Sequence, residues 1–375
     1  MSKNPFNLMY GRIPSESFVD RSYIVDNILN VFDDDTPASM AYAITGVRGS
    51  GKTVLLRDIV NKISLKNNWE TIDLNLGSNL VNSLANKLLH AGMQYKLFLD
   101  WKLTINASLI SLTIGKSKES ITDSEIILEE MLKKFKKENK KILIAIDEVN
   151  STKEIRYFAN VFQTLIGHGY DIFLLMTGLE SNIVSLFNNK ATSFLSRTPK
   201  IKLGPLDIKE ISLNYQKFLL LDEKRSIEYA KLTKGYAFAY QVLGYYLFEY
   251  SNCPLEEILE KFDIYMRNNG YDVIFNDLTS TEKKICLSLR EYDNQNADRI
   301  VDSLQISSNL FNKYRRLLIE KGIVESIGYG KLAFALPRFK EFVSYIKVYK
   351  WTSNFYKWLR YIKIGPRVPL ESIGD

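Results

Sequence analysis

Short, largely apolar segments alternate along the chain with longer segments in which apolar residues recur at helical spacing. Residues 41–44, 142–146 and 171–178 form such apolar segments, and each has the length of one strand. Strands that lack a polar face are typical of parallel sheets covered by helices on both sides. A largely apolar segment at 54–60 follows the first strand and predicts the start of a helix. The pattern therefore predicts an α/β fold with a parallel sheet in the N-terminal half.

A glycine-rich octet, GVRGSGKT, joins the first predicted strand to this helix. Gly49 and Gly51 allow the tight backbone that turns successive amides toward phosphate oxygens, and the positive end of the helix adds to that field. Lys52 is expected to reach the β- and γ-phosphates, and the Thr53 hydroxyl to ligate Mg²⁺. The sequence therefore predicts a P-loop for ATP and Mg²⁺. Its expected contacts are Gly46, Val47, Arg48, Gly49, Ser50, Gly51, Lys52 and Thr53.

An acidic pair follows the apolar strand at 142–146. Because ligands bind at the carboxyl edge of open α/β sheets, Asp147 is expected to hold Mg²⁺ directly or through water. Glu148 is the candidate for activating the attacking water. Thr177, at the end of the next strand, either touches the γ-phosphate or the water, or simply closes a turn. Arg197 either stabilises transition-state charge, within the chain or across a subunit interface, or is a surface arginine.

The order of these segments resembles the AAA+ class, and within it the prokaryotic ATPases similar to archaeal and eukaryotic origin-recognition proteins. Residues 18–21 are similar to the box that precedes the P-loop in this family and packs near the adenine. The resemblance implies adenine contacts by Val19 and Arg21. Asp20 stands where the family has glycine, and Ser22 stands where it has an acid.

The same resemblance implies Walker B roles for Asp147 and Glu148, a sensor-1 role for Thr177 and an arginine-finger role for Arg197. Residues 232–247 are similar to the lid-helix motif of related signalling (STAND) ATPases, Gly–hydrophobic–Pro followed by an apolar helix. Ala237 replaces the proline, and no arginine stands at the usual sensor-2 position. This departure favours a slow switch over rapid hydrolysis.

The last third of the chain predicts three short helices at 279–291, 296–304 and 309–322, then two β-rich runs around Gly328-Tyr329-Gly330. This order is typical of a winged helix–turn–helix, whose third helix reads a DNA groove. Residues 271–343 contain 11 Lys+Arg and 10 Asp+Glu, a net charge of 11 − 10 = +1. The candidate DNA contacts are Asn312, Lys313, Arg315, Arg316 and Lys331.

Composition limits the other possibilities. Two cysteines and two histidines without ligand-like spacing argue against a disulfide framework and a zinc site. No apolar run approaches the roughly 20 residues of a membrane span, which predicts a cytoplasmic protein. The net charge of +7 permits an anionic partner without demonstrating one. The basic and aromatic tail at 344–375 suits nucleic acid, packing on protein, or a membrane surface.

The predicted organisation is an AAA+ P-loop domain (1–205), a small helical lid (206–270), a winged helix–turn–helix (271–343) and the tail (344–375). The leading hypothesis is a slowly hydrolysing ATPase that acts as a nucleotide-controlled switch for binding duplex DNA. The alternative is a signalling or defence ATPase whose winged helix packs on the core and binds protein. A third hypothesis is a ring-forming motor in which Arg197 completes a neighbour's site through self-association.

Overall fold

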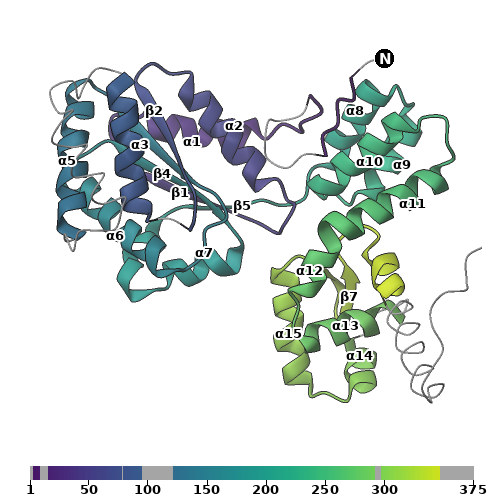
Figure 1. The fold of residues 1–375 in the computed structure, drawn as a ribbon. Coiled ribbons are helices and arrows are strands. Elements are labelled where there is room, and N and C mark those ends of the chain that lie inside the picture. Colours follow the sequence, from purple (N-terminus) through teal and green to yellow (C-terminus); the bar gives the residue numbers. More distant parts are fainter. Residues whose placement is uncertain (1–2, 9–15, 78, 95–120, 292–296, 347–375) are drawn as a thin grey trace, which may run out of the picture. The chain divides into compact units, whose positions relative to one another are not determined.

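The computed structural model describes residues 3–8, 16–77, 79–94, 121–291 and 297–346 (Figure 1). The chain divides into two compact units, Met1–Ser251 and Asn252–Asp375. The tail predicted at 344–375 lies outside the described residues from position 347 onward, and its role stays a prediction.

A five-stranded parallel sheet with the strand order β2-β3-β4-β1-β5 forms the centre of the first unit. All residues of β1 and β4 are buried, because helices cover both faces of the sheet. This confirms the predicted α/β P-loop fold. Strand β2 is not predicted by the apolar pattern, since polar residues interrupt it. The strands are β1 (Ala41–Thr45), β2 (Trp69–Leu74), β3 (Lys141–Ile146), β4 (Ile172–Gly178) and β5 (Lys200–Lys202).

Two separate hydrophobic clusters hold helices to the two faces of this sheet (Figure 1). Helices α1 (Ser22–Asp33) and α2 (Lys52–Ser64) pack on one face. The opposite face carries the remaining helices of the sheet domain. These are α3 (Leu80–Gln94), α5 (Ile121–Lys137), α6 (Lys153–Gly167) and α7 (Glu180–Phe187), with the 3-10 segment η2 (Lys190–Arg197) after them. Because helices cover both faces, the loops that follow the strands lie at the carboxyl edge of the sheet.

Three helices complete the first unit as a small lid, α8 (Ile208–Leu219), α9 (Glu223–Leu232) and α10 (Ala237–Glu249). The N-terminal segment packs on them: Phe6 is buried against the rings of Tyr215 and Tyr240. Gly244 permits this approach, because a Cβ there would lie 2.4 Å from the Phe6 ring. The start of the chain thus forms part of the lid.

The helical segments and strands of the second unit include the three helices and the hairpin that the sequence predicts, in the predicted order. They are α11 (Leu255–Met266), the π-helical turn η3 (Arg267–Tyr271), α12 (Asp272–Asn276), α13 (Ser280–Glu291), α14 (Ala297–Leu304) and α15 (Ser308–Glu320), then the antiparallel strands β6 (Val324–Gly328) and β7 (Lys331–Phe334). Its assignment as a winged helix–turn–helix stays a prediction.

The boundary between the units differs from the expected one. Residues 252–270, which the sequence placed in the lid, belong to the second unit. The physical reason is an ion pair: Arg338 donates to both carboxylate oxygens of Asp263, each at 2.6 Å. Such a bidentate pair holds α11 to the end of the hairpin segment. We therefore place the end of the lid near Ser251.

A buried carboxylate joins α13 to the end of α15 in the second unit. Glu282 is fully buried and accepts hydrogen bonds from the Thr279 backbone N–H at 2.8 Å and from Lys321 Nζ at 2.6 Å. Burial alone raises the pKa of Glu282, but the bonds from Lys321 and Thr279 hold it below its ordinary value. Thr279 and Glu282 thus form a capping box at the start of α13.

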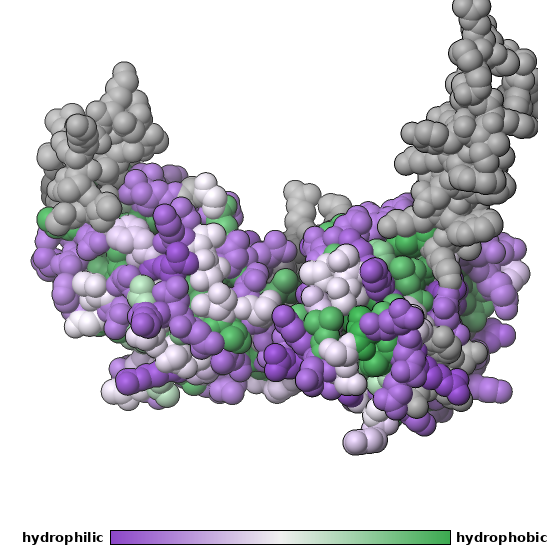
Figure 2. Space-filling model, turned by 90° about the horizontal axis from the view of Figure 1, so that it is seen from below, coloured by the Kyte–Doolittle hydropathy of each residue, from purple (hydrophilic) through white to green (hydrophobic). Residues whose placement is uncertain are grey.

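None of the helices within the described ranges has both the length and the apolar character needed to cross a membrane. On the face drawn in Figure 2, hydrophilic residues predominate and hydrophobic residues form smaller groups among them.

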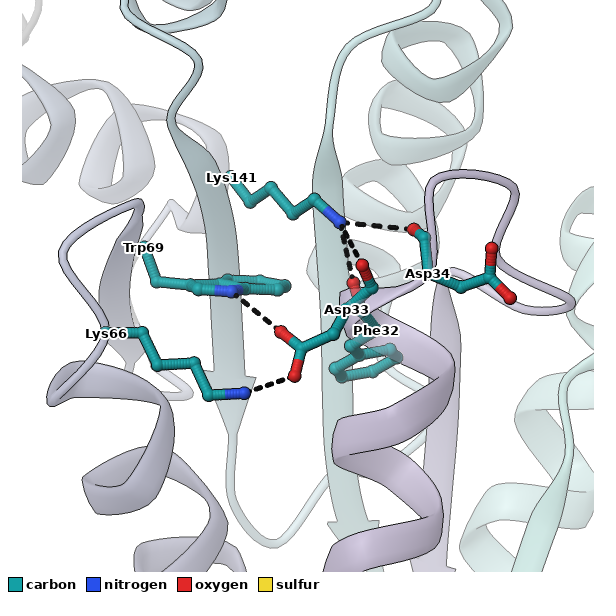
Figure 3. A network of polar contacts seen from close by, with 6 residues as sticks. All are labelled: Phe32, Asp33, Asp34, Lys66, Trp69 and Lys141. Carbon is teal, nitrogen blue, oxygen red and sulfur yellow. Dashed lines mark hydrogen bonds and ion pairs between the residues drawn. The ribbon is translucent and has the colours of Figure 1, made fainter.

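Polar contacts close the amino edge of the sheet, opposite the predicted site (Figure 3). Lys141, at the start of β3, donates to the carbonyl oxygens of Phe32, Asp33 and Asp34 at 3.0, 3.2 and 3.2 Å. These carbonyls end helix α1, so the lysine caps that helix. The Asp33 carboxylate in turn accepts hydrogen bonds from Lys66 and from Trp69 Nε1. The network therefore connects α1 with the first residues of β2 and β3.

Replacing Lys141 with methionine should destabilise the first unit by about 1–3 kcal/mol, because three carbonyls lose their shared donor. Urea unfolding monitored by tryptophan fluorescence measures the change. Lys137→Met, at the exposed end of α5, is the control for the loss of one charge. Equal unfolding midpoints for the two variants would contradict the capping role.

Candidate nucleotide-binding site

The glycine-rich octet forms a tight loop between β1 and α2, as the sequence predicts. Gly49 and Gly51 adopt φ values of 77° and 92°, the left-handed region that favours glycine. Helix α2 begins at Lys52, so its unpaired amides and positive end face this loop. The backbone is therefore arranged as an anion-binding site.

Lys52 spans the loop. Its Nζ donates to the carbonyl oxygens of Gly46 at 3.1 Å and Val47 at 2.8 Å. Burial lowers the pKa of the Lys52 ammonium, and Arg48 acts in the same direction, while the carboxylates of Asp147 and Glu148 oppose them. A cation held in this way faces the acidic end of β3 and can neutralise phosphate charge.

Ser50 indicates how well the loop fits a phosphate. Its side chain is only 5% exposed, and its hydroxyl is the one buried side-chain oxygen or nitrogen without a hydrogen-bond partner in the described residues. Leaving such a group unsatisfied costs about 1–3 kcal/mol. A loop of backbone donors, a lysine and an unsatisfied hydroxyl is chemically suited to a polyphosphate.

The acidic pair meets the P-loop through hydroxyl groups. Thr53 Oγ1 donates to Asp147 Oδ2 at 2.8 Å, and Thr177 Oγ1 donates to Asp147 Oδ1. The Thr177 hydroxyl also accepts a hydrogen bond from the Glu148 backbone N–H at 3.1 Å. The structure thus brings Thr53, Asp147 and Thr177 together from α2, β3 and β4. Hydroxyl and carboxylate oxygens are the ligands that Mg²⁺ prefers.

Among the described residues, no group of three or more His, Cys, Asp or Glu side chains is placed to hold a metal. A Mg²⁺ site typically uses one or two protein oxygens together with phosphates and water. Thr53 and Asp147 are the residues that would hold the ion.

Glu148 has an unusual backbone. Its φ of 56° lies in the left-handed region, which is uncommon for a residue other than glycine. The hydrogen bonds from its N–H to Asp147 Oδ1 and Thr177 Oγ1 hold it there. Glu148 is exposed, and within the described residues its carboxylate forms no hydrogen bond or ion pair. Strain of this kind is common at functional sites, and here it leaves a free carboxylate beside the P-loop.

The predicted role of Thr177 changes in the structure. Its side chain is fully buried, and its hydroxyl both donates to and accepts from the acidic pair. The hydroxyl is therefore committed to Asp147 and Glu148, and we propose an orienting role in place of contact with the γ-phosphate.

Val19 and Arg21, the expected adenine contacts, are both buried at the entry to α1. Arg21 Nη2 donates to the Gly204 carbonyl oxygen at 3.1 Å, and burial lowers the pKa of its guanidinium. Arg21 therefore lies beside the connection between β5 and the lid, and the contact of both residues with adenine stays a prediction.

Arg197 ends η2 and is exposed. Within the described part of the chain, no hydrogen bond or ion pair joins it to the P-loop or to the acidic pair. Its role as a finger, within the chain or in a neighbour's site, stays a prediction.

Sequence reasoning missed two groups of residues. Arg57 pairs with Asp73 at 2.6 Å, and both line a pocket of about 260 Å³ together with Asp147 and Glu148. Arg57 lies one turn beyond the P-loop on α2, which is the only sequence signal for it. The second group is the start of α10, where Tyr236 contacts the P-loop. The Gly235-Tyr236 step of the lid motif is its signal.

In the second unit, Asn312, Lys313 and Arg316 are exposed on α15, and Lys331 is exposed on β7. Arg315 is half-buried and donates to Ser326 Oγ of the hairpin at 3.0 Å. The expected DNA contacts therefore separate into four exposed side chains and one that holds the helix to the hairpin.

Residues 18–219 match a family described as an ATPase domain predominantly from Archaea, and residues 268–343 match a domain of unknown function. The fold is similar to that of the Walker-type ATPase of Pyrococcus abyssi, with a TM-score of 0.61 and 14% identity. That match covers 90% of this chain and 99% of the other. No curated protein matches the sequence.

The ORC2 protein of Aeropyrum pernix, in ADPNP–ADP complexes, is also similar, with a TM-score of 0.55 and 13% identity over 92% of this chain and 98% of that one. At these identities the similarity concerns the fold alone. It confirms the α/β P-loop ATPase fold that the motifs predict.

Proposed function

Because this chain belongs to a family of ATPase domains found predominantly in Archaea, we propose that it binds ATP with Mg²⁺ and acts as a slowly hydrolysing switch for contact with duplex DNA. The observation that supports this most is the cluster at the carboxyl edge of the sheet. Thr53, Asp147 and Thr177 are hydrogen-bonded beside the P-loop lysine, and no described residue forms a hydrogen bond or ion pair with the Glu148 carboxylate.

Each residue of the site has a separate task. The loop amides bind phosphate oxygens, and Lys52 offsets their charge. Mg²⁺, when bound to Thr53 and Asp147, compensates the charge shared between the β- and γ-phosphates. Glu148 accepts a proton from the attacking water, and Thr177 orients Asp147 by hydrogen bonding.

The composition of the lid helix α10 favours slow hydrolysis. Helix α10 has the sequence AFAYQVLGYYLFE, which contains no arginine or lysine. Without a cation from this helix, less transition-state charge is stabilised, since arginine contributes strongly to phosphoryl transfer. The ATP-bound state would then last long enough to act as a signal.

The DNA-binding part of the proposal depends on α15 and the hairpin. Lys313 and Arg316 are exposed on the third helix of the predicted winged helix–turn–helix. Among the described residues, Arg316 has one long ion pair, with Glu320 at 3.7 Å, so its guanidinium is available to a phosphate. Helices in this position enter the major groove of DNA in proteins of the winged-helix type.

The test is duplex-DNA binding by fluorescence anisotropy, with ATP·Mg²⁺ or ADP, across a series of salt concentrations. Affinity should depend on the nucleotide. Lys313→Ala combined with Arg316→Ala should reduce the slope of log K against log salt by about two, since each lost phosphate contact removes about 0.9. Lys224→Ala with Lys231→Ala, both exposed on α9, is the control of equal charge. An unchanged slope in the α15 variant would remove this helix from the interface.

A second function, a signalling ATPase whose C-terminal unit binds protein, is favoured by a different observation. Residues 271–343 are nearly neutral, and the hairpin exposes the apolar side chains of Ile327 and Tyr329. An exposed aromatic at a loop tip suits a protein partner. Absence of DNA binding in every nucleotide state would favour this alternative.

A further inference from the structure

The lid donates hydrogen bonds to backbone carbonyl oxygens of the P-loop. The Tyr236 hydroxyl, just before α10, donates to the Arg48 carbonyl oxygen at 2.8 Å. Two residues later, the Phe238 backbone N–H donates to the Gly49 carbonyl oxygen at 3.1 Å. Two successive peptide carbonyls of the P-loop are therefore held by one short segment of the lid.

Peptide geometry gives these two bonds a consequence for the phosphate site. In a trans peptide the C=O and the following N–H point in opposite directions. Because the carbonyls of Arg48 and Gly49 point to the lid, the N–H groups of Gly49 and Ser50 must point away from it. The Ser50 N–H indeed points toward the Val47 carbonyl oxygen, at 3.2 Å, which also accepts from Lys52 Nζ. That is the inner side of the loop.

We propose that Tyr236 is a positioning residue: its hydroxyl orients the P-loop amides for the β-phosphate and so couples the lid to nucleotide binding. This inference rests on the proposed function, since it concerns the same nucleotide site. Preorganised donors bind more tightly because they lose less freedom when the ligand arrives. In place of a charged residue that touches the phosphate, the lid supplies a neutral hydroxyl that orients the groups touching it.

The approach is close enough to be specific. A Cβ built on Gly49 would lie 2.2 Å from the Tyr236 hydroxyl oxygen, so this contact requires glycine. Tyr236 itself is 7% exposed. The preceding Gly235 has a φ of 71°, and its carbonyl oxygen accepts a hydrogen bond from the Leu206 N–H at 2.8 Å. The connection between sheet and lid thus fixes the place of the tyrosine.

The test is Tyr236→Phe, which retains the buried ring and removes only the hydroxyl. Displacement of a fluorescent ADP analogue should show ADP and ATP affinities reduced by about five- to tenfold, as expected for one lost hydrogen bond. AMP, which lacks the β-phosphate, should lose less than twofold. In protein labelled with ¹⁵N-glycine, the Gly49 amide resonance of the nucleotide-free variant should shift, because its peptide plane loses an anchor.

The matched control is Tyr215→Phe, which removes a buried hydroxyl that donates to the Tyr240 carbonyl oxygen at 3.0 Å within the lid. It should leave the ADP-to-AMP affinity ratio and the Gly49 resonance unchanged. Wild-type ADP affinity in Tyr236→Phe, or an equal loss in the control, would overturn the inference. Failure of the wild-type protein to bind either nucleotide would instead overturn the proposed function, and this inference with it.

Discussion

Replacing Lys52 with alanine is expected to reduce the affinity for ATP about a hundredfold or more. The half-buried ammonium is held by the carbonyls of Gly46 and Val47, and it is expected to face the β- and γ-phosphates. Charge-assisted hydrogen bonds are the strongest single contacts such a site can make. Isothermal titration with ATP·Mg²⁺ measures the loss.

Lys62→Ala is the matched control, because Lys62 lies on the same helix and pairs only with Asp58 one turn earlier, at 3.2 Å. It should bind ATP as the wild-type protein does. If Lys52→Ala retained wild-type affinity, the nucleotide would have to bind elsewhere, and the assignment of residues 46–53 as the P-loop would be wrong.

Glu148→Gln is expected to retain ATP binding and to lower the hydrolysis rate about 10²- to 10⁴-fold, the usual contribution of a general base. Glutamine has the same size, so the left-handed backbone and its two hydrogen bonds to Asp147 and Thr177 should persist. The variant cannot accept the proton from water. Phosphate release under single-turnover conditions measures the change.

Glu154→Gln, in the first turn of α6, is the control for this substitution. Hydrolysis at the wild-type rate by Glu148→Gln would show that another group activates the water. If the switch proposal holds, Glu148→Gln should also keep the DNA affinity of the ATP-bound state after ATP is added. The anisotropy measurement reports this affinity.

The sheet was predictable where the chain is apolar on both faces. Strands β1, β3 and β4 are continuous buried runs, and a buried parallel strand has no polar face to interrupt the pattern. Strand β2 was not predicted, because Glu70, Thr71 and Asp73 break its apolar sequence. Its pairing with β3 could be recognised only in the sheet.

The nucleotide site also has parts that the sequence predicts and contacts that only the structure shows. The P-loop is one continuous segment whose chemistry depends on local backbone geometry, so its glycines, lysine and threonine can be identified from spacing. The link between Thr53 and Asp147 joins residues 94 positions apart, and only the parallel arrangement of β1, β4 and β3 brings them within 2.8 Å. The sequence suggested both residues but not their contact.

Local chemistry therefore determined the type of fold, the place of the phosphate loop and the acidic end of β3, since each depends on residues adjacent in the chain. Tertiary structure decided which groups remain free for a ligand. It commits Thr177 and Arg315 to neighbouring residues and places the Tyr236 hydroxyl on a carbonyl 188 positions away. Among the residues that the structure describes, it leaves the Glu148 carboxylate without a hydrogen bond or ion pair. Hydrogen bonding is short-ranged and directional, so such partners are chosen only when packing has set the distances between elements.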